Sequence, residues 1–255
     1  MNPEASIRFL ETSHGSRLAW TGAEIPGKPT IVFLHGHGSD MDGTKALATA
    51  AWANTSGFGM IRFDYSGHGR SDGAFLDGTI GAWKEDCLAV IDHLTTGAVI
   101  LVGSSLGGWL MMLAARERTP RIAGMIGIAA APDFTDDLIW NQLTTEQQAE
   151  MKRDGRIALP NPYAPEDVIY TLKLIEDGRN HMVLSSPLRL DCPVRLLHGG
   201  KDKEVPVNTA DKLAAAIISP DLDVIIDADA DHRFSEPDQI DLLLSCLDAI
   251  TRKIG

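Results

Sequence analysis

The chain has 255 residues, with 35 Asp and Glu against 23 Lys and Arg, which gives a formal net charge of −12. A chain of this length can bury a substantial core, and its hydrophobic content of 44% is too high for a disordered protein. The acidity disfavours nucleic acid as a partner, because phosphate recognition needs concentrated positive charge, and no apolar run approaches the roughly 18 residues that span a bilayer.

Short apolar segments predict strands along the whole chain. In chain order they are 7–12, 17–20, 30–34, 59–63, 98–102, 124–129, 194–197 and 223–226. Several are unbroken apolar runs, such as IVFL and VILV, which are typical of strands covered on both faces in a mostly parallel sheet. The first two segments alternate with polar residues and predict an antiparallel hairpin at the edge.

Between these strands, apolar residues recur at spacings of three and four, which indicates helices with one apolar face. The predicted helices are 43–55, 79–94, 106–118, 208–217 and 237–252. Strands that alternate with helices predict an α/β fold with a doubly wound sheet of about eight strands.

Residues 133–190 interrupt this alternation. We expect helices over 136–153 and 165–177 there, and no convincing strand, so the segment is interpreted as a helical cap inserted into a core formed by 1–132 and 191–255. The cap should supply an apolar pocket for an acyl or alcohol group next to Trp109, with Trp140 as the other predicted substrate-binding residue. Further candidates for this pocket, although residues of these types belong more often to the core, are Met151, Tyr163, Tyr170 and Met182.

The sequence Gly103-Ser104-Ser105-Leu106-Gly107 fits the pattern GxSxG. The pattern alone is weak, but here it follows the apolar strand AVILV and opens the helix 106–118. This context predicts a nucleophile elbow, in which small flanking residues let the chain turn tightly and expose the serine hydroxyl. In this frame Ser105 is the nucleophile and Ser104 is not. The alternative is a serine that caps the helix N-terminus.

A serine nucleophile needs a base, and the base needs an orienting carboxylate. Only His198 and His232 follow the cap. His198 ends the strand VRLLH, where a turn-lining role explains it, whereas His232 lies in the loop between the last strand and the last helix. We therefore predict that His232 is the base.

Asp202 follows the strand VRLLH, at the carboxyl end where sites in open α/β sheets form. It is the predicted orienting acid, and Glu204 is its nearest rival. The remaining acidic residues near the base, which are interpreted as a solvated turn, are Asp227, Asp229 and Asp231.

Two backbone N–H groups must stabilise the oxyanion that forms when the serine attacks. One is expected from Leu106, the residue after the nucleophile, and the other from His37 in the loop 35–39. The pair His35 and His37 has no third ligand spaced for a metal, and the glycines complete no GxGxxG, so neither a metal nor a cofactor is expected. The segment 62–72 is interpreted mainly as a loop braced by Asp64 and Arg70.

In element order, elbow, oxyanion loop and triad, the chain resembles the α/β-hydrolase superfamily. The segments MDGTKALA, IRFDYSGHGRSDG, ILVGSSLGGWLM, LSSPLRLDCPVRLLHG and DADHRF resemble the acyl-protein thioesterase and acyl-glucuronide esterase group known in mitochondria. The resemblance carries the catalytic roles over onto Ser105, Asp202 and His232. Two departures, the absence of a transit extension and the His35-Gly36 opening, suggest a bacterial relative.

These observations predict a cytoplasmic serine hydrolase that cleaves carboxylic esters or thioesters, of small molecules or acylated proteins, without a cofactor. Three widely separated cysteines fit a reducing compartment. A peptidase or a carbon–carbon bond hydrolase would use the same triad, and a non-catalytic ligand-binding homologue is a further alternative. Dehalogenases and epoxide hydrolases of this fold are disfavoured, because their nucleophile is a carboxylate. The oligomeric state stays open.

Overall fold

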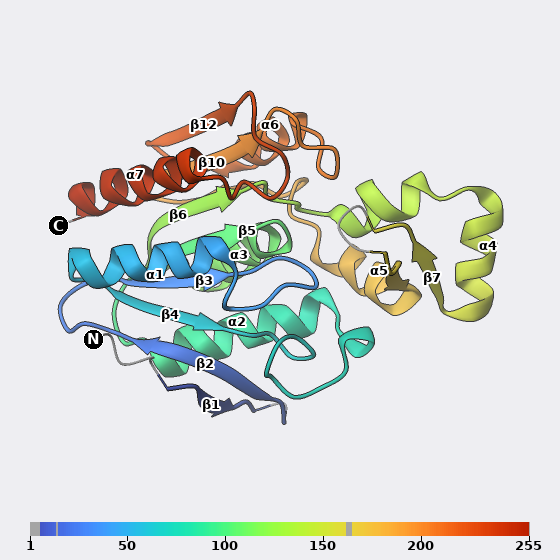
Figure 1. Cartoon of the computed structure of the whole chain (residues 1–255), viewed down its shortest axis with the longest axis horizontal. Helices are drawn as coiled ribbons and strands as arrows, with labels where there is room; N and C mark the ends of the chain where they lie inside the picture. The colour runs from blue at the N-terminus through green and yellow to red at the C-terminus, as the bar shows by residue number, and fades with distance from the viewer. Residues whose placement is uncertain (1–5, 14, 162–164, 255) are drawn as a thin grey trace.

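An eight-stranded sheet forms the centre of the protein in a computed structural model, which describes residues 6–13, 15–161 and 165–254 (Figure 1). The strand order is β1-β2-β4-β3-β5-β6-β10-β12. β1 pairs with β2 and β2 with β4 in antiparallel fashion, and all later pairs are parallel. The strands are β1 (Arg8–Glu11), β2 (Arg17–Ala23), β3 (Thr30–Leu34), β4 (Gly59–Phe63), β5 (Val99–Ser104), β6 (Ile122–Ile128), β10 (Val194–Gly199) and β12 (Leu222–Asp227).

The apolar runs of the sequence form the middle of this sheet. Every residue of β3, β5 and β10 is buried, whereas the polar-alternating β1 is mostly exposed at the edge. The expected mostly parallel sheet and its antiparallel edge hairpin are therefore confirmed. Strands buried on both faces need apolar side chains in both directions, which explains their unbroken runs.

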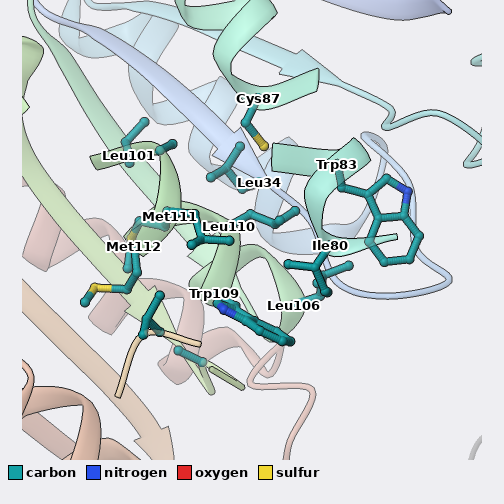
Figure 2. Close-up of a cluster of buried hydrophobic side chains, with 14 of the residues drawn as sticks. Leu34, Ile80, Trp83, Cys87, Leu101, Leu106, Trp109, Leu110, Met111 and Met112 are labelled. Atoms are coloured by element: carbon teal, nitrogen blue, oxygen red, sulfur yellow. The ribbon is translucent and has the colours of Figure 1, made fainter. Parts of the chain in front are cut away.

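Helices cover both faces of the sheet. α1 (Thr44–Ser56) and α7 (Pro237–Ile254) pack against one face, and α2 (Ile80–Leu94), α3 (Leu106–Glu117) and α6 (Asn208–Ala215) pack against the other. Figure 2 shows the second face, where Trp83, Trp109 and neighbouring aliphatic side chains form a continuous apolar core. Short elements complete this part of the chain: η1 (Phe75–Asp77), η2 (Thr119–Arg121), β9 (Leu188–Arg189) and β11 (Ile217–Ile218). None of the described helices is long and apolar enough to cross a membrane.

The inserted segment lies beyond the carboxyl ends of the parallel strands (Figure 1). It contains η3 (Thr135–Ile139), η4 (Trp140–Gln142), α4 (Thr145–Asp154), β7 (Arg156–Leu159), β8 (Val168–Thr171), α5 (Leu172–Gly178) and η5 (Arg179–His181). β7 and β8 pair antiparallel. The expectation that the cap contains no strand is therefore wrong. The helical stretch expected over 136–153 is divided into η3, η4 and α4, and in the one expected over 165–177 the α-helix starts only at Leu172.

Local signals explain these corrections. The Thr144 side chain accepts the N–H of Gln147, whose side chain accepts the Thr144 N–H in return, and this capping box starts α4. Gly155, with φ of 73°, ends it in the left-handed conformation. The following segments RIAL and VIYT form a hairpin, in which VIYT consists of β-branched and aromatic residues.

Asp133 fastens the cap where it leaves and rejoins the core. The side chain is 1% exposed, and its two carboxylate oxygens accept the backbone N–H groups of Val183 at 2.8 Å and Leu184 at 3.0 Å. Its φ of 57° turns the chain at the start of the insertion. One carboxylate thus holds together two points of the chain that are 50 residues apart.

Candidate active site

Ser105 stands at the sharp turn between β5 and α3. Its φ of 53° and ψ of −117° lie in a region that non-glycine residues rarely adopt, and its N–H donates to the Ile128 carbonyl at 3.0 Å. A Cβ at Gly107 would lie 1.9 Å from the Leu34 carbonyl oxygen, and one at Gly103 would lie 2.3 Å from the Gly107 carbonyl oxygen. Both glycines of the pattern are therefore imposed by close packing of backbone on backbone around the turn.

The structure brings the three predicted triad residues together in one chain of hydrogen bonds. His232 Nε2 lies 3.0 Å from Ser105 Oγ, and His232 Nδ1 lies 2.8 Å from Asp202 Oδ2. Asp202 follows β10, and His232 lies between β12 and α7, so neighbouring parallel strands place acid and base at the same edge of the sheet. This is the geometry of a nucleophile, a base and an orienting acid.

The Asp202 side chain is buried and is surrounded by donors. Its Oδ1 accepts the N–H groups of Glu204 at 3.0 Å and Val205 at 2.8 Å. Burial alone would raise the pKa of Asp202, but hydrogen bonds from His198 and His232 reverse this effect and hold the pKa well below its usual range. The carboxylate therefore stays charged beside the imidazole.

His198 is a part of the site that sequence reasoning assigned only to a turn. Its Nε2 lies 3.0 Å from the Val205 carbonyl oxygen and 3.3 Å from Asp202 Oδ2. Both neighbours are acceptors, so this nitrogen carries the hydrogen and donates to them. The spacing of four residues between His198 and Asp202, just past a strand end, was the one available signal.

Among the described residues, no rival carboxylate is hydrogen-bonded to His232. Glu204 lies in the pocket wall, Asp229 pairs with Lys201 at 2.6 Å, and Asp227 and Asp231 accept backbone N–H groups of their own turn. Among the described residues, the one group of side chains close enough to hold a metal ion is Asp202, Glu204 and His232. Asp202 and His232 already hydrogen-bond to each other, and neither His35 nor His37 belongs to this group.

The loop 35–39 lies directly against the nucleophile, because a Cβ at Gly36 would lie 3.5 Å from Ser105 Cβ. Leu106 is the first residue of α3. Within the described part of the chain, the backbone N–H groups of His37 and Leu106 donate to no protein acceptor. Two uncommitted donors on either side of a serine are what an oxyanion hole requires.

A pocket of about 860 Å³ opens above Ser105 and His232. Most of its wall is apolar, and the cap hairpin supplies one side of it. The apolar and aromatic lining residues include Phe75, Leu76, Leu106, Phe134, Leu138, Ile139, Leu159, Val168, Ile169, Tyr170 and Val205. Its size and apolar lining are typical of a small-molecule or acyl-chain site.

Trp109 and Trp140 were predicted to bind substrate, but among the described residues neither lines this pocket, so that prediction is corrected. Trp109 is fully buried, and its indole N–H donates to the His181 carbonyl at 2.9 Å, so it ties α3 to the cap. Trp140 packs beneath Lys152 and Arg179. Of the other candidates, Tyr170 lines the pocket, Met151 is in the core, Met182 is outside the wall, and Tyr163 lies outside the described residues.

Comparison with known proteins agrees with this architecture. Residues 31–241 match the model of the "Alpha/beta hydrolase family". The bovine (Bos taurus) mitochondrial palmitoyl-protein thioesterase ABHD10 is 41% identical over 257 residues, covering 99% of this chain and 82% of that protein. A putative hydrolase from Agrobacterium vitis S4 superposes with a TM-score of 0.92 at 38% identity, over 98% of this chain and 100% of the other. Mouse alpha/beta hydrolase domain-containing protein 10 gives 0.90 at 39% identity, with the same two coverages.

Proposed function

Because the chain belongs to the α/β-hydrolase family and is an esterase or thioesterase of the kind represented by ABHD10, we propose that it removes long acyl chains from protein cysteines, with Ser105 as nucleophile. The observation that carries the proposal is the hydrogen bond of 3.0 Å between Ser105 Oγ and His232 Nε2 at the base of an apolar pocket. The thioesterase name of relatives at about 40% identity supports the choice of a thioester.

The reaction proceeds in two halves. Ser105 Oγ attacks the acyl carbon while His232 takes its proton; the carbon–sulfur bond then breaks, His232 gives the proton to the sulfur, and the cysteine thiol leaves the acyl-serine. Water then attacks the acyl-serine while His232 takes a proton from it; the bond to Ser105 Oγ breaks, His232 returns the proton to this oxygen, and the carboxylic acid leaves. Asp202 fixes the imidazole with its Nδ1–H toward the carboxylate and stabilises the imidazolium. The N–H groups of His37 and Leu106 stabilise the oxyanion, and loss of one such donor typically lowers turnover by about 10²–10³-fold.

The pocket wall favours an acyl chain over a polar group. Side chains of the cap hairpin, Leu159 on β7 and Val168 to Tyr170 on β8, face those of the core across the space above Ser105. Each methylene that becomes buried contributes about 0.8 kcal/mol, or roughly fourfold in kcat/KM. We therefore expect kcat/KM to rise with acyl length until the pocket is filled.

A series of S-acylated cysteine peptides with acyl chains of 4, 8, 12 and 16 carbons tests the proposal. Thiol release measured against each peptide should give a kcat/KM that increases along the series. The Ser105→Ala protein should release no thiol and should lose labelling by a fluorophosphonate. A flat or falling series would contradict the long-chain substrate, and cleavage by the Ser105→Ala protein would contradict the nucleophile.

The matched O-acyl serine peptide separates ester from thioester preference, and a peptide with an unmodified backbone tests for peptidase activity. We expect the thioester to be cleaved fastest, because a thiol leaves more readily than an alcohol. A cytoplasmic location stays a prediction, to be checked by fractionation of the source cells.

A further inference from the structure

His68 lies at the centre of the segment 64–72, which the catalytic steps above leave without a role. The side chain is 3% exposed and is not among the residues that line the pocket. Its imidazole is fixed by the rings of Phe75, Trp83 and Tyr65, at centroid distances of 5.0, 5.2 and 5.5 Å. A substituted His68 therefore cannot change activity by touching the substrate.

The segment 64–72 supports the oxyanion loop through several hydrogen bonds. His68 Nε2 accepts the Gly38 N–H at 3.3 Å, and Asp64 Oδ1 accepts the Met41 N–H at 2.7 Å. The Tyr65 hydroxyl donates to the His35 carbonyl at 3.1 Å. These bonds reach the loop 35–39 at His35 and Gly38, and the chain just after it at Met41.

The partners of His68 define its tautomer. Nδ1 lies 3.4 Å from the Ser66 carbonyl oxygen, which can only accept, so Nδ1 carries the hydrogen and Nε2 is left as an acceptor for Gly38. Burial lowers the pKa of His68 to about 3, so the ring is neutral under working conditions. An imidazolium would present a hydrogen at Nε2 and could not accept this bond.

The bond to Gly38 acts on a turn with two alternative forms. The Ser39 N–H donates to the Gly36 carbonyl at 3.1 Å, and Gly38 has φ of 68°, as in a type II turn. Types I and II differ by a flip of the central peptide, here the one between His37 and Gly38. The N–H of that peptide is the group that His68 accepts.

We propose that His68 is a positioning residue of the oxyanion hole: it holds the His37–Gly38 peptide in the type II orientation and so fixes the turn whose preceding peptide carries the His37 N–H beside Ser105. The proposal rests on the proposed roles of Ser105 and His37. The proposal gives His68, in the motif GHG at 67–69, a function in stabilising the transition state.

Two substitutions separate the hydrogen bond from ring packing. His68→Phe keeps an aromatic ring without an acceptor, whereas His68→Gln places an amide oxygen close to the position of Nε2. With a short p-nitrophenyl ester, we expect the Phe variant to lose about 10- to 100-fold in kcat with KM within about twofold, and the Gln variant to recover most of the loss. The Ki of an alkyl trifluoromethyl ketone, which forms an oxyanion on the serine, should rise by the same factor as kcat falls.

A folded Phe variant with normal kcat, a loss confined to KM, or an unchanged Ki would overturn the proposal. If the Phe variant does not fold, the ¹⁵N chemical shifts of the His68 ring in the wild-type protein decide instead. They should show hydrogen on Nδ1, and a hydrogen on Nε2 would refute the acceptor role. The ester assay and the ring shifts do not depend on thioester cleavage, so failure of the long-chain substrate leaves this test intact.

Discussion

Mild acid should destabilise the folded protein through two deeply buried imidazoles. Burial lowers the pKa of His35 from 6.5 to about 4 and that of His68 to about 3. Between these values and 6.5, the unfolded chain binds more protons than the folded protein, so the free energy of unfolding decreases as the pH falls. The decrease begins near pH 6.5 and levels off only near pH 3 to 4.

The size of this decrease in the free energy of unfolding follows from the difference between the pH and the ordinary histidine pKa. At pH 5 each ring stands about 1.5 pH units below 6.5, which corresponds to about 2 kcal/mol per histidine and about 4 kcal/mol for both. Neither side chain is more than 3% exposed, so solvent screening reduces these values little. Asp64 acts in the opposite direction, because burial raises its carboxyl pKa in the folded state. A loss of this size is a large part of a typical domain stability of roughly 5–15 kcal/mol.

Urea unfolding at pH 7.5 and pH 5, followed by tryptophan fluorescence, measures the effect in the wild-type protein and in His68→Gln. The substitution lowers stability at both pH values, so the readout is the difference between them. We expect that difference to decrease by about 2 kcal/mol in the variant. His93→Gln, at an exposed position on α2, is the control and should keep the wild-type difference. An identical difference in wild type and His68→Gln would refute the reasoning.

Three further outcomes are expected. Asp202→Asn should stay folded and lose about 10⁴-fold in kcat, measured with a fluorogenic ester, because the imidazole loses its correct tautomer; near-normal turnover would remove Asp202 from the triad. Gly103→Ala should destabilise the protein by more than about 3 kcal/mol, because the new Cβ would lie 2.3 Å from a carbonyl oxygen. Gly97→Ala, with no atom within 4 Å of its Cβ, is the matched control in the same thermal-unfolding assay. Asp133→Asn should lower the free energy of unfolding by about 1–3 kcal/mol, because an amide cannot accept both cap N–H groups, and an unchanged melting temperature would contradict this.

The core fold and the three triad positions could be predicted from sequence because their signals are local. A strand buried on both faces must be apolar throughout, as β3 and β5 are. The elbow needs small residues at fixed offsets from Ser105, and the order of acid and base along the chain narrows the remaining choice.

The cap and the supporting residues could not be predicted in this way. β7 and β8 have four residues each, too few for a period to be recognised, and their pairing is decided by contact with each other. Trp109 lies on an apolar helix whose residues are nearly all buried, where periodicity does not tell a core position from a pocket position. His198 and His68 act through neighbours brought close by the fold, so the letter His alone carried no information about them.

The two hydrogen bonds that Asp133 accepts from Val183 and Leu184 also bear on how the insertion can change during evolution. Because the start of the insertion and residues near its end meet at one carboxylate, the bonds of Asp133 form a closed junction between the insertion and the core. The entropy of closing a loop grows only slowly with its length, so longer or shorter insertions on that junction alter stability modestly. A different segment grafted between Asp133 and Val183 would keep these two ends joined and would leave the triad and the oxyanion loop as they are, but it would have to replace the bond between Trp109 and the His181 carbonyl.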